Sequence, residues 1–258
     1  MRVGLDGQIA IVTGAAQGIG RAIALRLGEA GAAGILLTDR QSAGHVAKEL
    51  GDQGTLTEFV QADFQDDATP ATVLQACLSR FGRIDRLVNA AGITDRASVA
   101  DASSETFDRL FQVNTKTPLF LMQRCILQMR EQGDGGAIVN ILTMNIHGGS
   151  PNIALYAASK AAFALLTRNA AHAHRFDRIR INGVAVGWVD TPGERQTQRD
   201  VLGRSDDWLA AKGAERPFGR LLDPDDVARL ATFLVSDSSS PMTGAIVDQE
   251  QWVNGARD

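Results

Sequence analysis

Short runs of aliphatic and β-branched residues alternate along the chain with longer stretches in which apolar residues recur at helical spacing. The runs that indicate strands are QIAIVTG (8–14), GILLTD (34–39), LTEFVQAD (56–63), IDRLVNAAG (84–92), GAIVNIL (136–142), IRINGVAV (179–186) and GAIVDQ (244–249). Stretches such as GIGRAIALRLGEAG and DVARLATFLVSD indicate helices between them. This alternation predicts right-handed βαβ crossovers and a parallel sheet covered on both faces.

No internal repeat, low-complexity tract or Pro/Gly-rich linker divides the 258 residues. We therefore expect a single α/β domain over 1–258, built on a doubly wound parallel sheet of about seven strands with helices on both faces. The least regular part is the polar stretch 187–218, between the sixth strand and a late helix. A long excursion at this place predicts a lid or substrate loop.

The composition and charge of the chain argue against several classes of function. The formal net charge is −4 and no block of Lys or Arg appears, which argues against a nucleic-acid partner. No apolar run is long enough to span a membrane, and the N-terminal residues lead into a strand without a signal-peptide core, so we expect a cytoplasmic protein. Cys77 and Cys125 lack the spacing of a metal site, so we expect buried free thiols and no bound metal.

A glycine-rich turn joins the first expected strand to the first expected helix. In IVTGAAQGIGRAIA (11–24), Gly14, Gly18 and Gly20 lie where the strand ends and the helix begins. Glycine lets a pyrophosphate approach main-chain N–H groups, and the N-terminus of a helix favours the negative charge. Tight packing alone also uses glycine, but here the second expected strand ends in an acidic residue, Asp39. Together these features predict a dinucleotide-binding site.

Asp39 also bears on which dinucleotide binds. A carboxylate at this position accepts hydrogen bonds from both ribose hydroxyls of NAD and repels the 2′-phosphate of NADP. Arg40 follows it, and a guanidinium there can pair with a 2′-phosphate. We expect NAD rather than NADP, because Asp39 would have to move or be paired before that phosphate could bind.

Tyr156 is the only tyrosine in the chain, and Lys160 follows it one helical turn later. The i, i+4 spacing places both side chains on one helical face. A free phenol, with a pKa of about 10, is a poor base at neutral pH, but a nearby ammonium group and an oxidised nicotinamide ring stabilise the phenolate. Beside the dinucleotide motifs, the pair predicts an acid–base group for hydride transfer rather than a half-buried aromatic next to a solvated lysine.

Five motifs, in the right order, resemble those of the short-chain dehydrogenase/reductase family over essentially the whole chain. They are TGAAQGIG (13–20) for the family's TGxxxGIG, Asp63 in QAD, NAAG (89–92) for NNAG, Asn114 in QVNTKTP, and Tyr156 with Lys160 for YxxxK. The chain departs from the family pattern at Thr143, where serine is usual, at Val186-Gly187 in place of Pro-Gly, and at 250–252, where Glu-Gln-Trp replaces Asp-Gly-Gly.

The resemblance implies a Rossmann-type fold and a set of site residues. Its catalytic residues would be Asn114, Thr143, Tyr156 and Lys160, with Thr143 donating to the substrate oxygen and Asn114 holding a water that links Lys160 to solvent. Its cofactor-binding residues would be Gly14, Gln17, Gly18, Ile19, Gly20, Asp39, Arg40, Asp63, Phe64, Asn89, Ala90, Ala91, Gly92, Tyr156, Lys160, Gly187, Val189 and Thr191. Family members commonly pair the helix at 156–174 across a dimer interface, which implies a homotetramer.

The residues expected to face a small-molecule substrate are mostly hydrogen-bonding groups. They are Thr94, Asp95, Arg96, Asn145, His147, Asn152, Trp188, Glu194 and Arg195, of which Asn145, His147, Trp188 and Glu194 are the principal candidates. A steroid or long acyl chain needs an apolar trough, whereas a polyhydroxylated substrate suits this mixture. We expect hydride transfer between NAD and the carbon of a secondary alcohol or ketone, in a sugar or polyol.

Two other functions remain open. One is an NADP-dependent carbonyl or 3-oxoacyl-thioester reductase of the same fold, against which Asp39 argues. The other is a non-catalytic NAD-binding regulator, against which Asn114, Tyr156 and Lys160 argue, while Thr143 leaves it open.

Overall fold

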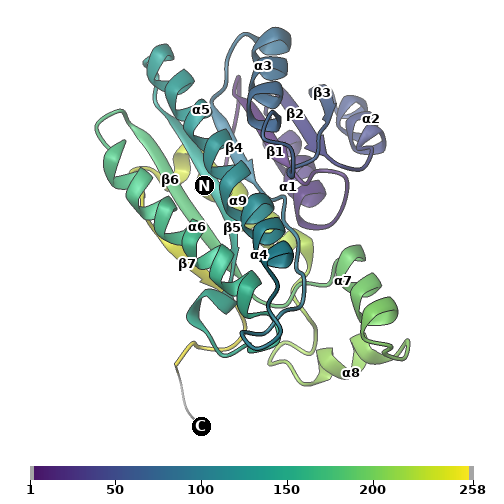
Figure 1. The fold of residues 1–258 in the computed structure, drawn as a ribbon. Helices are drawn as coiled ribbons and strands as arrows, with labels where there is room; N and C mark the ends of the chain where they lie inside the picture. Colours follow the sequence, from purple (N-terminus) through teal and green to yellow (C-terminus); the bar gives the residue numbers. More distant parts are fainter. Residues whose placement is uncertain (1–2, 256–258) are drawn as a thin grey trace.

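All seven expected strands form, and they make one parallel sheet in the order β3-β2-β1-β4-β5-β6-β7 (Figure 1). The computed structural model describes residues 3–255. The strands are β1 (Ile9–Thr13), β2 (Gly34–Asp39), β3 (Leu56–Gln61), β4 (Arg86–Asn89), β5 (Gly136–Thr143), β6 (Ile179–Val186) and β7 (Ile246–Gln249). The expected strand at 84–92 is shortened the most, since β4 begins at Arg86 and ends at Asn89.

Helices cover both faces of the sheet, which confirms the doubly wound α/β fold (Figure 1). The α-helices are α1 (Gly18–Glu29), α2 (Gly44–Asp52), α3 (Thr69–Phe81), α4 (Ser104–Phe111), α5 (Thr117–Gln132), α6 (Ala154–Ala173), α7 (Pro192–Gln196), α8 (Trp208–Ala214) and α9 (Pro224–Val235). Short π-helical turns are η1 (Gln112–Lys116) and η3 (Thr197–Val201), and 3₁₀ turns are η2 (Met144–His147) and η4 (Asp237–Ser239). Of the described helices, none is long and apolar enough to cross a membrane.

Two hydrophobic cores lie on opposite faces of the sheet, and each central strand contributes to both. In β5, Val139 and Ile141 pack with α1, α2 and α9, whereas Ile138 and Leu142 pack with α3, α5 and α6. Successive side chains of a strand point to opposite faces, so a continuous apolar run suits a sheet that is buried on both sides.

Cys77 and Cys125 are free thiols buried in the second of these cores, as expected. Burial raises the pKa of Cys77 to about 12, so its thiol stays protonated. No group of three or more metal-ligating side chains occurs in residues 3–255.

A polar cavity of about 730 Å³ lies at the amino edge of the sheet, away from the candidate residues. Two of its arginines donate hydrogen bonds to carbonyls at helix ends. Arg178 donates to the carbonyl of Gly133 after α5, and Arg180 donates to the carbonyls of Leu234 and Ser236 at the end of α9. Helix C-termini carry partial negative charge, and arginine offsets it. These two arginines therefore have a structural role at the amino edge of the sheet.

The stretch 187–218 is more regular than its sequence indicated, since it holds α7, η3 and α8. The side chain of Thr191 accepts a hydrogen bond from the N–H of Glu194, and Pro192 occupies the first turn of α7. Thr-Pro-Gly-Glu is therefore a helix start with an N-cap threonine, and this part is helical where an irregular stretch was expected. The segment lies at one end of the sheet, apart from the two helical layers (Figure 1).

Candidate active site

The carboxyl edge of the sheet brings the candidate residues together. Thr13, Asp39, Asn89 and Thr143 are the last residues of their strands, and Gly187 follows β6 directly. The strand order reverses between β1 and β4, which is where doubly wound sheets bind their ligands.

The turn from β1 into α1 requires glycine. Gly14 has φ +67°, and a Cβ there would lie 2.9 Å from the backbone of Ala91. A Cβ at Gly20 would lie 2.1 Å from the carbonyl oxygen of Gly14. The turn thus packs β1, β4 and α1 closely while the N-terminus of α1 points its free N–H groups into the edge, an arrangement that fits a pyrophosphate.

Side chains from several elements hold this turn in place, and three of them, Thr13, Asn140 and Thr167, were not selected as site residues from the sequence. The hydroxyl of Thr13 accepts hydrogen bonds from the N–H groups of Ala90 and Ala91, both at 3.0 Å. Asn89 donates to Asn140 on β5 at 2.9 Å, and Asn140 donates in turn to Thr167 on α6. The spacing of residues along one strand cannot predict this hydrogen-bond network, because its members come from different strands and a helix.

The carboxylate of Asp39 lies beside the glycine turn. One oxygen accepts the N–H of Ala16 at 3.0 Å and the other accepts the N–H of Gln41 at 2.8 Å. Each carboxylate oxygen can accept a further hydrogen bond, so both stay able to bind ribose hydroxyls. The side chain of Arg40 is exposed.

Asp63 and Phe64 follow β3 at the same edge. The carboxylate of Asp63 accepts the N–H of Gln65 at 2.9 Å, and the carbonyl of the buried Phe64 accepts the hydroxyl of Thr117 at 2.6 Å. These bonds fix the two residues next to Asp39, because β3 pairs with β2 up to that residue.

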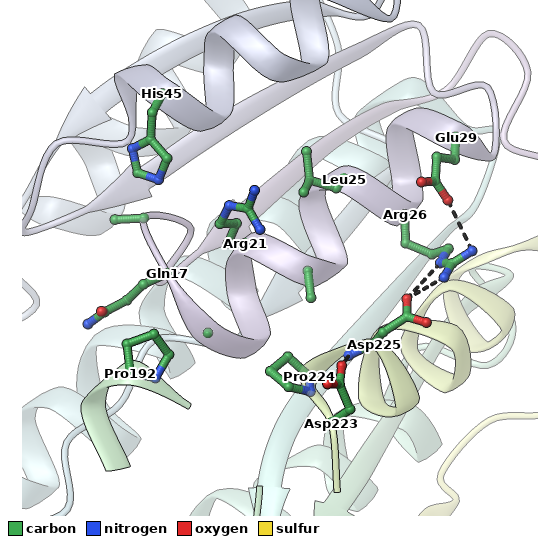
Figure 2. Close-up of a pocket in the computed structure, with 13 residues that line it drawn as sticks. Gln17, Arg21, Leu25, Arg26, Glu29, His45, Pro192, Asp223, Pro224 and Asp225 are labelled. Carbon is green, nitrogen blue, oxygen red and sulfur yellow. Dashed lines mark hydrogen bonds and ion pairs between the residues drawn. The ribbon is translucent and has the colours of Figure 1, made fainter. Parts of the chain in front are cut away.

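A cavity of about 540 Å³ adjoins the glycine turn along α1 (Figure 2). Gln17 and Pro192 border one end of it, and His45 of α2 forms another part of the wall. Its charged side chains are mainly paired with one another or with neighbours, since Arg21 bonds Glu49 and Arg26 bonds Asp225. The two arginines that line the cavity are therefore held in ion pairs.

Tyr156 lies on the first turn of α6, where its hydroxyl is hydrogen-bonded to Thr143 at the end of β5 and to Thr94 after β4. The hydroxyl of Thr143 accepts hydrogen bonds from the backbone N–H and the side-chain amide of Asn145, at 3.3 and 3.2 Å. With its lone pairs used this way, Thr143 keeps its own proton for donation. The departure from serine therefore preserves the hydroxyl where the family has one.

Burial is the largest effect on the phenol and raises the pKa of Tyr156. The hydrogen bonds to Thr143 and Thr94 act in the lowering direction, and the negative charge of Glu194 raises the pKa further. The sequence indicated that Lys160 would lower this pKa, but the groups that act on the phenol within the chain are these others.

Lys160 is buried, with 5% of its surface exposed, and donates from Nζ to the carbonyl of Ile141 at 2.9 Å. A Cβ at Gly92 would lie 3.2 Å from this Nζ and 3.1 Å from Oδ1 of Asn114, so the three groups meet at the end of β4. Burial lowers the pKa of Lys160 to about 8.

Asn114 lies in the π-helical turn η1 rather than in a regular helix. Its side chain accepts the N–H of Ile93 and donates to the carbonyl of Ile93 and to the hydroxyl of Ser159, which precedes Lys160. π-Turns inside helices are frequent at functional sites, because they shift a backbone carbonyl out of the helical ladder.

Replacing Lys160 with methionine is expected to stabilise the fold at pH 7 by about 2 kcal/mol, because the buried ammonium group is disfavoured. The folded-state pKa of about 8 lies below the ordinary 10.5, so the lysine chain gains stability as pH rises from about 8 to 10.5. The advantage of Lys160→Met should shrink over that range. Urea denaturation at pH 7 and pH 10.5 measures it, and an equal or larger advantage at pH 10.5 would contradict the expectation.

The candidate substrate residues divide into two groups. Asn145 and Glu194 lie by the catalytic hydroxyls, the first through Thr143 and the second through its charge on Tyr156. Trp188 donates from Nε1 to Glu194 at 2.9 Å. His147 instead lies 3.0 Å from the carboxylate of Asp248 on the edge strand β7, a contact that fixes the loop after β5.

Gly187, Val189 and Thr191 line the path from β6 to α7. Gly187 donates to the carbonyl of Gln249, and Val189 is buried in a bridge with Leu222. The methyl group of Thr191 lies 3.3 Å from the Cβ position of Gly18, so the start of the lid packs on the glycine turn.

Comparison with known proteins gives the same assignment. Residues 14–250 match the family model described as Enoyl-(Acyl carrier protein) reductase. The chain is 35% identical to cis-4-hydroxycyclohexanecarboxylate dehydrogenase of Sinomonas cyclohexanicum, over 93% of this chain and 94% of that protein. It is also 35% identical to the short-chain dehydrogenase/reductase FrzI of Cladobotryum sp, over 93% of each chain.

A solved structure agrees over the full length. L-sorbose reductase from Gluconobacter frateurii, complexed with NADPH and L-sorbose, superposes with a TM-score of 0.92 at 25% identity and 100% coverage of both chains. The fold, the clustered hydroxyls with Lys160, and these relatives together show that the chain belongs to the short-chain dehydrogenase/reductase family, and that it is an oxidoreductase acting on CH–OH groups with a nicotinamide nucleotide.

Proposed function

We propose that the protein interconverts a secondary alcohol and a ketone in a neutral sugar or polyol, with NAD(H) as cofactor. The observation that carries the proposal is the Thr143–Tyr156–Lys160 cluster at the carboxyl edge of a sheet whose second strand ends in Asp39. A bound nicotinamide would accept or donate the hydride at the carbinol carbon.

The chain's own residues manage the proton. Thr143 donates to the substrate oxygen and, with Thr94, orients the phenol of Tyr156. Tyr156 removes the hydroxyl proton during oxidation and returns it during reduction. Lys160 binds the nicotinamide ribose, and the buried contacts around Asn114 and Ser159 provide a route by which a proton leaves for solvent.

We favour NAD as the cofactor, although the superposed sorbose reductase was solved with NADPH. Two backbone N–H groups fix the carboxylate of Asp39 beside the turn, so it cannot swing away from a 2′-phosphate without losing both hydrogen bonds. Arg40 is exposed next to it, and the bound NADPH of that neighbour supports the second candidate, an NADP-dependent carbonyl reductase.

An absorbance screen at 340 nm tests the proposal. Neutral polyols and sugars, hydroxy acids and simple secondary alcohols are offered with NAD and with NADP. We expect turnover of neutral polyols with NAD in preference to NADP. Absence of turnover across the panel despite tight dinucleotide binding would overturn the proposal and favour a non-catalytic NAD-binding regulator.

We also propose a single domain over 1–258 whose lid is 187–218, assembled as a homotetramer in the cytoplasm. Exposed apolar side chains on α5 and α6, including Phe120, Leu127 and Leu165, support assembly, because such groups gather where helices meet a partner. The free buried thiols suit a reducing compartment. Light scattering coupled to chromatography tests the tetramer.

A further inference from the structure

The lid places a carboxylate beside the catalytic phenol and fixes it with two donors. One oxygen of Glu194, Oε1, accepts from Nε1 of Trp188 at 2.9 Å and from Nε2 of Gln198 at 2.5 Å. Trp188 follows β6, whose last residue, Val186, pairs with Thr143. The sheet register therefore holds this carboxylate at the catalytic edge.

Trp188 is itself held in place. Its ring stacks on Trp208 of α8 with centroids 5.9 Å apart, and the guanidinium of Arg216 lies 5.4 Å from its centroid. An indole fixed by both neighbours directs its N–H at one point. Glu194 is thus presented by a rigid support and not by a mobile loop tip.

Two acceptor atoms in this cluster have no donor in residues 3–255. Gln198 is only 4% exposed, yet its Oε1 is buried without a hydrogen bond. Its amide cannot be turned round, because that would place two oxygens against each other at Glu194. Oε2 of Glu194 likewise takes part in no hydrogen bond among the described residues. Oε2 of Glu194 is open to solvent, unlike the buried Oε1 of Gln198, so it is the acceptor that a ligand can reach.

The position of Glu194 also works against the catalytic base. Its negative charge raises the pKa of Tyr156, which makes the phenolate harder to form.

We infer that Glu194, positioned by Trp188 and Gln198, recognises a second hydroxyl of the substrate, next to the carbinol that Tyr156 deprotonates. The inference rests on the proposed function and narrows its substrate class to neutral molecules with neighbouring hydroxyls. A hydroxyl donates to Oε2 of Glu194, whose other oxygen Trp188 and Gln198 hold in place, whereas a substrate carboxylate meets a like charge and is rejected.

Glu194→Gln tests the inference with two ring alcohols, cis-1,2-cyclohexanediol and cyclohexanol. We expect kcat/KM for the diol to fall about 10- to 100-fold, because a charge-assisted hydrogen bond is lost, and kcat/KM for cyclohexanol to change by less than about threefold. Glu215→Gln is the matched control, since Glu215 is a lid carboxylate paired with Lys212 on the surface. It should leave both values unchanged.

With a hydroxy acid as substrate, the same substitution should change kcat/KM in the opposite direction. With cis-4-hydroxycyclohexanecarboxylate, Glu194→Gln should raise kcat/KM, because the like charge is removed. An equal loss on the diol and on cyclohexanol would overturn the inference while leaving the proposed function intact. Absence of wild-type turnover of either ring alcohol with either cofactor would overturn both.

Discussion

Replacing Tyr156 with phenylalanine is expected to lower kcat by about 10³-fold, because the phenol that we propose moves the substrate proton is removed. The ring and its packing on α6 remain, so the protein should fold and bind the dinucleotide with an affinity within about threefold of wild type. Steady-state rates at 340 nm measure the first effect, and titration of the quenching of the three tryptophans measures the second.

Thr143→Ser is the companion variant for this experiment. It keeps the hydroxyl that donates to the substrate oxygen and removes only the methyl group, so most of the activity should persist. If Tyr156→Phe keeps substantial turnover, the phenol is not the acid–base group. In that case the hydroxyls of Thr94 and Thr143 would have to carry the proton.

The strands and the main helices were predictable because their signal is local. A strand buried on both faces must be apolar throughout, and β5 and β6 are apolar along most of their length for that reason. The cofactor turn was predictable on similar grounds, since Gly14 and Gly20 occupy places where a Cβ would collide with backbone.

The contacts that tune the site were not predictable in the same way. Thr94 was expected near the substrate, but its hydrogen bond to Tyr156 joins the loop after β4 to α6, which only the folded chain brings together. Gln198 was missed, although it follows Glu194 by one helical turn, because the lid was expected to be irregular. The effect of burial on the pKa of Tyr156 also depends on neighbours that are distant in sequence.

The balance at Tyr156 connects the catalytic cluster with the lid. Burial and Glu194 both oppose ionisation of the phenol, whereas Thr143 and Thr94 support it. We expect bound cofactor and substrate to alter that balance. A substrate hydroxyl that donates to Glu194 would disperse part of its charge, so substrate recognition and activation of the base are expected to be coupled.

Replacing Asp39 with asparagine is expected to reduce the preference for NAD over NADP by about 100-fold. The wild-type carboxylate repels a 2′-phosphate, and juxtaposed like charges cost several kcal/mol, with about 1.4 kcal/mol for each tenfold change. Asparagine keeps the shape and one acceptor oxygen, so one of the two backbone hydrogen bonds, from Ala16 or Gln41, is retained. The ratio of kcat/KM for NAD and NADP measures the change.

Asp66→Asn is the matched control, because Asp66 lies in the turn after β3 and accepts only a local hydrogen bond from Ala68. It removes the same charge from the same edge and should leave the cofactor ratio unchanged. A wild-type enzyme that used NADP as well as NAD would contradict the role given to Asp39. The exposed guanidinium of Arg40 would then be the group that binds the phosphate, and Arg40→Ala would lower kcat/KM for NADP alone.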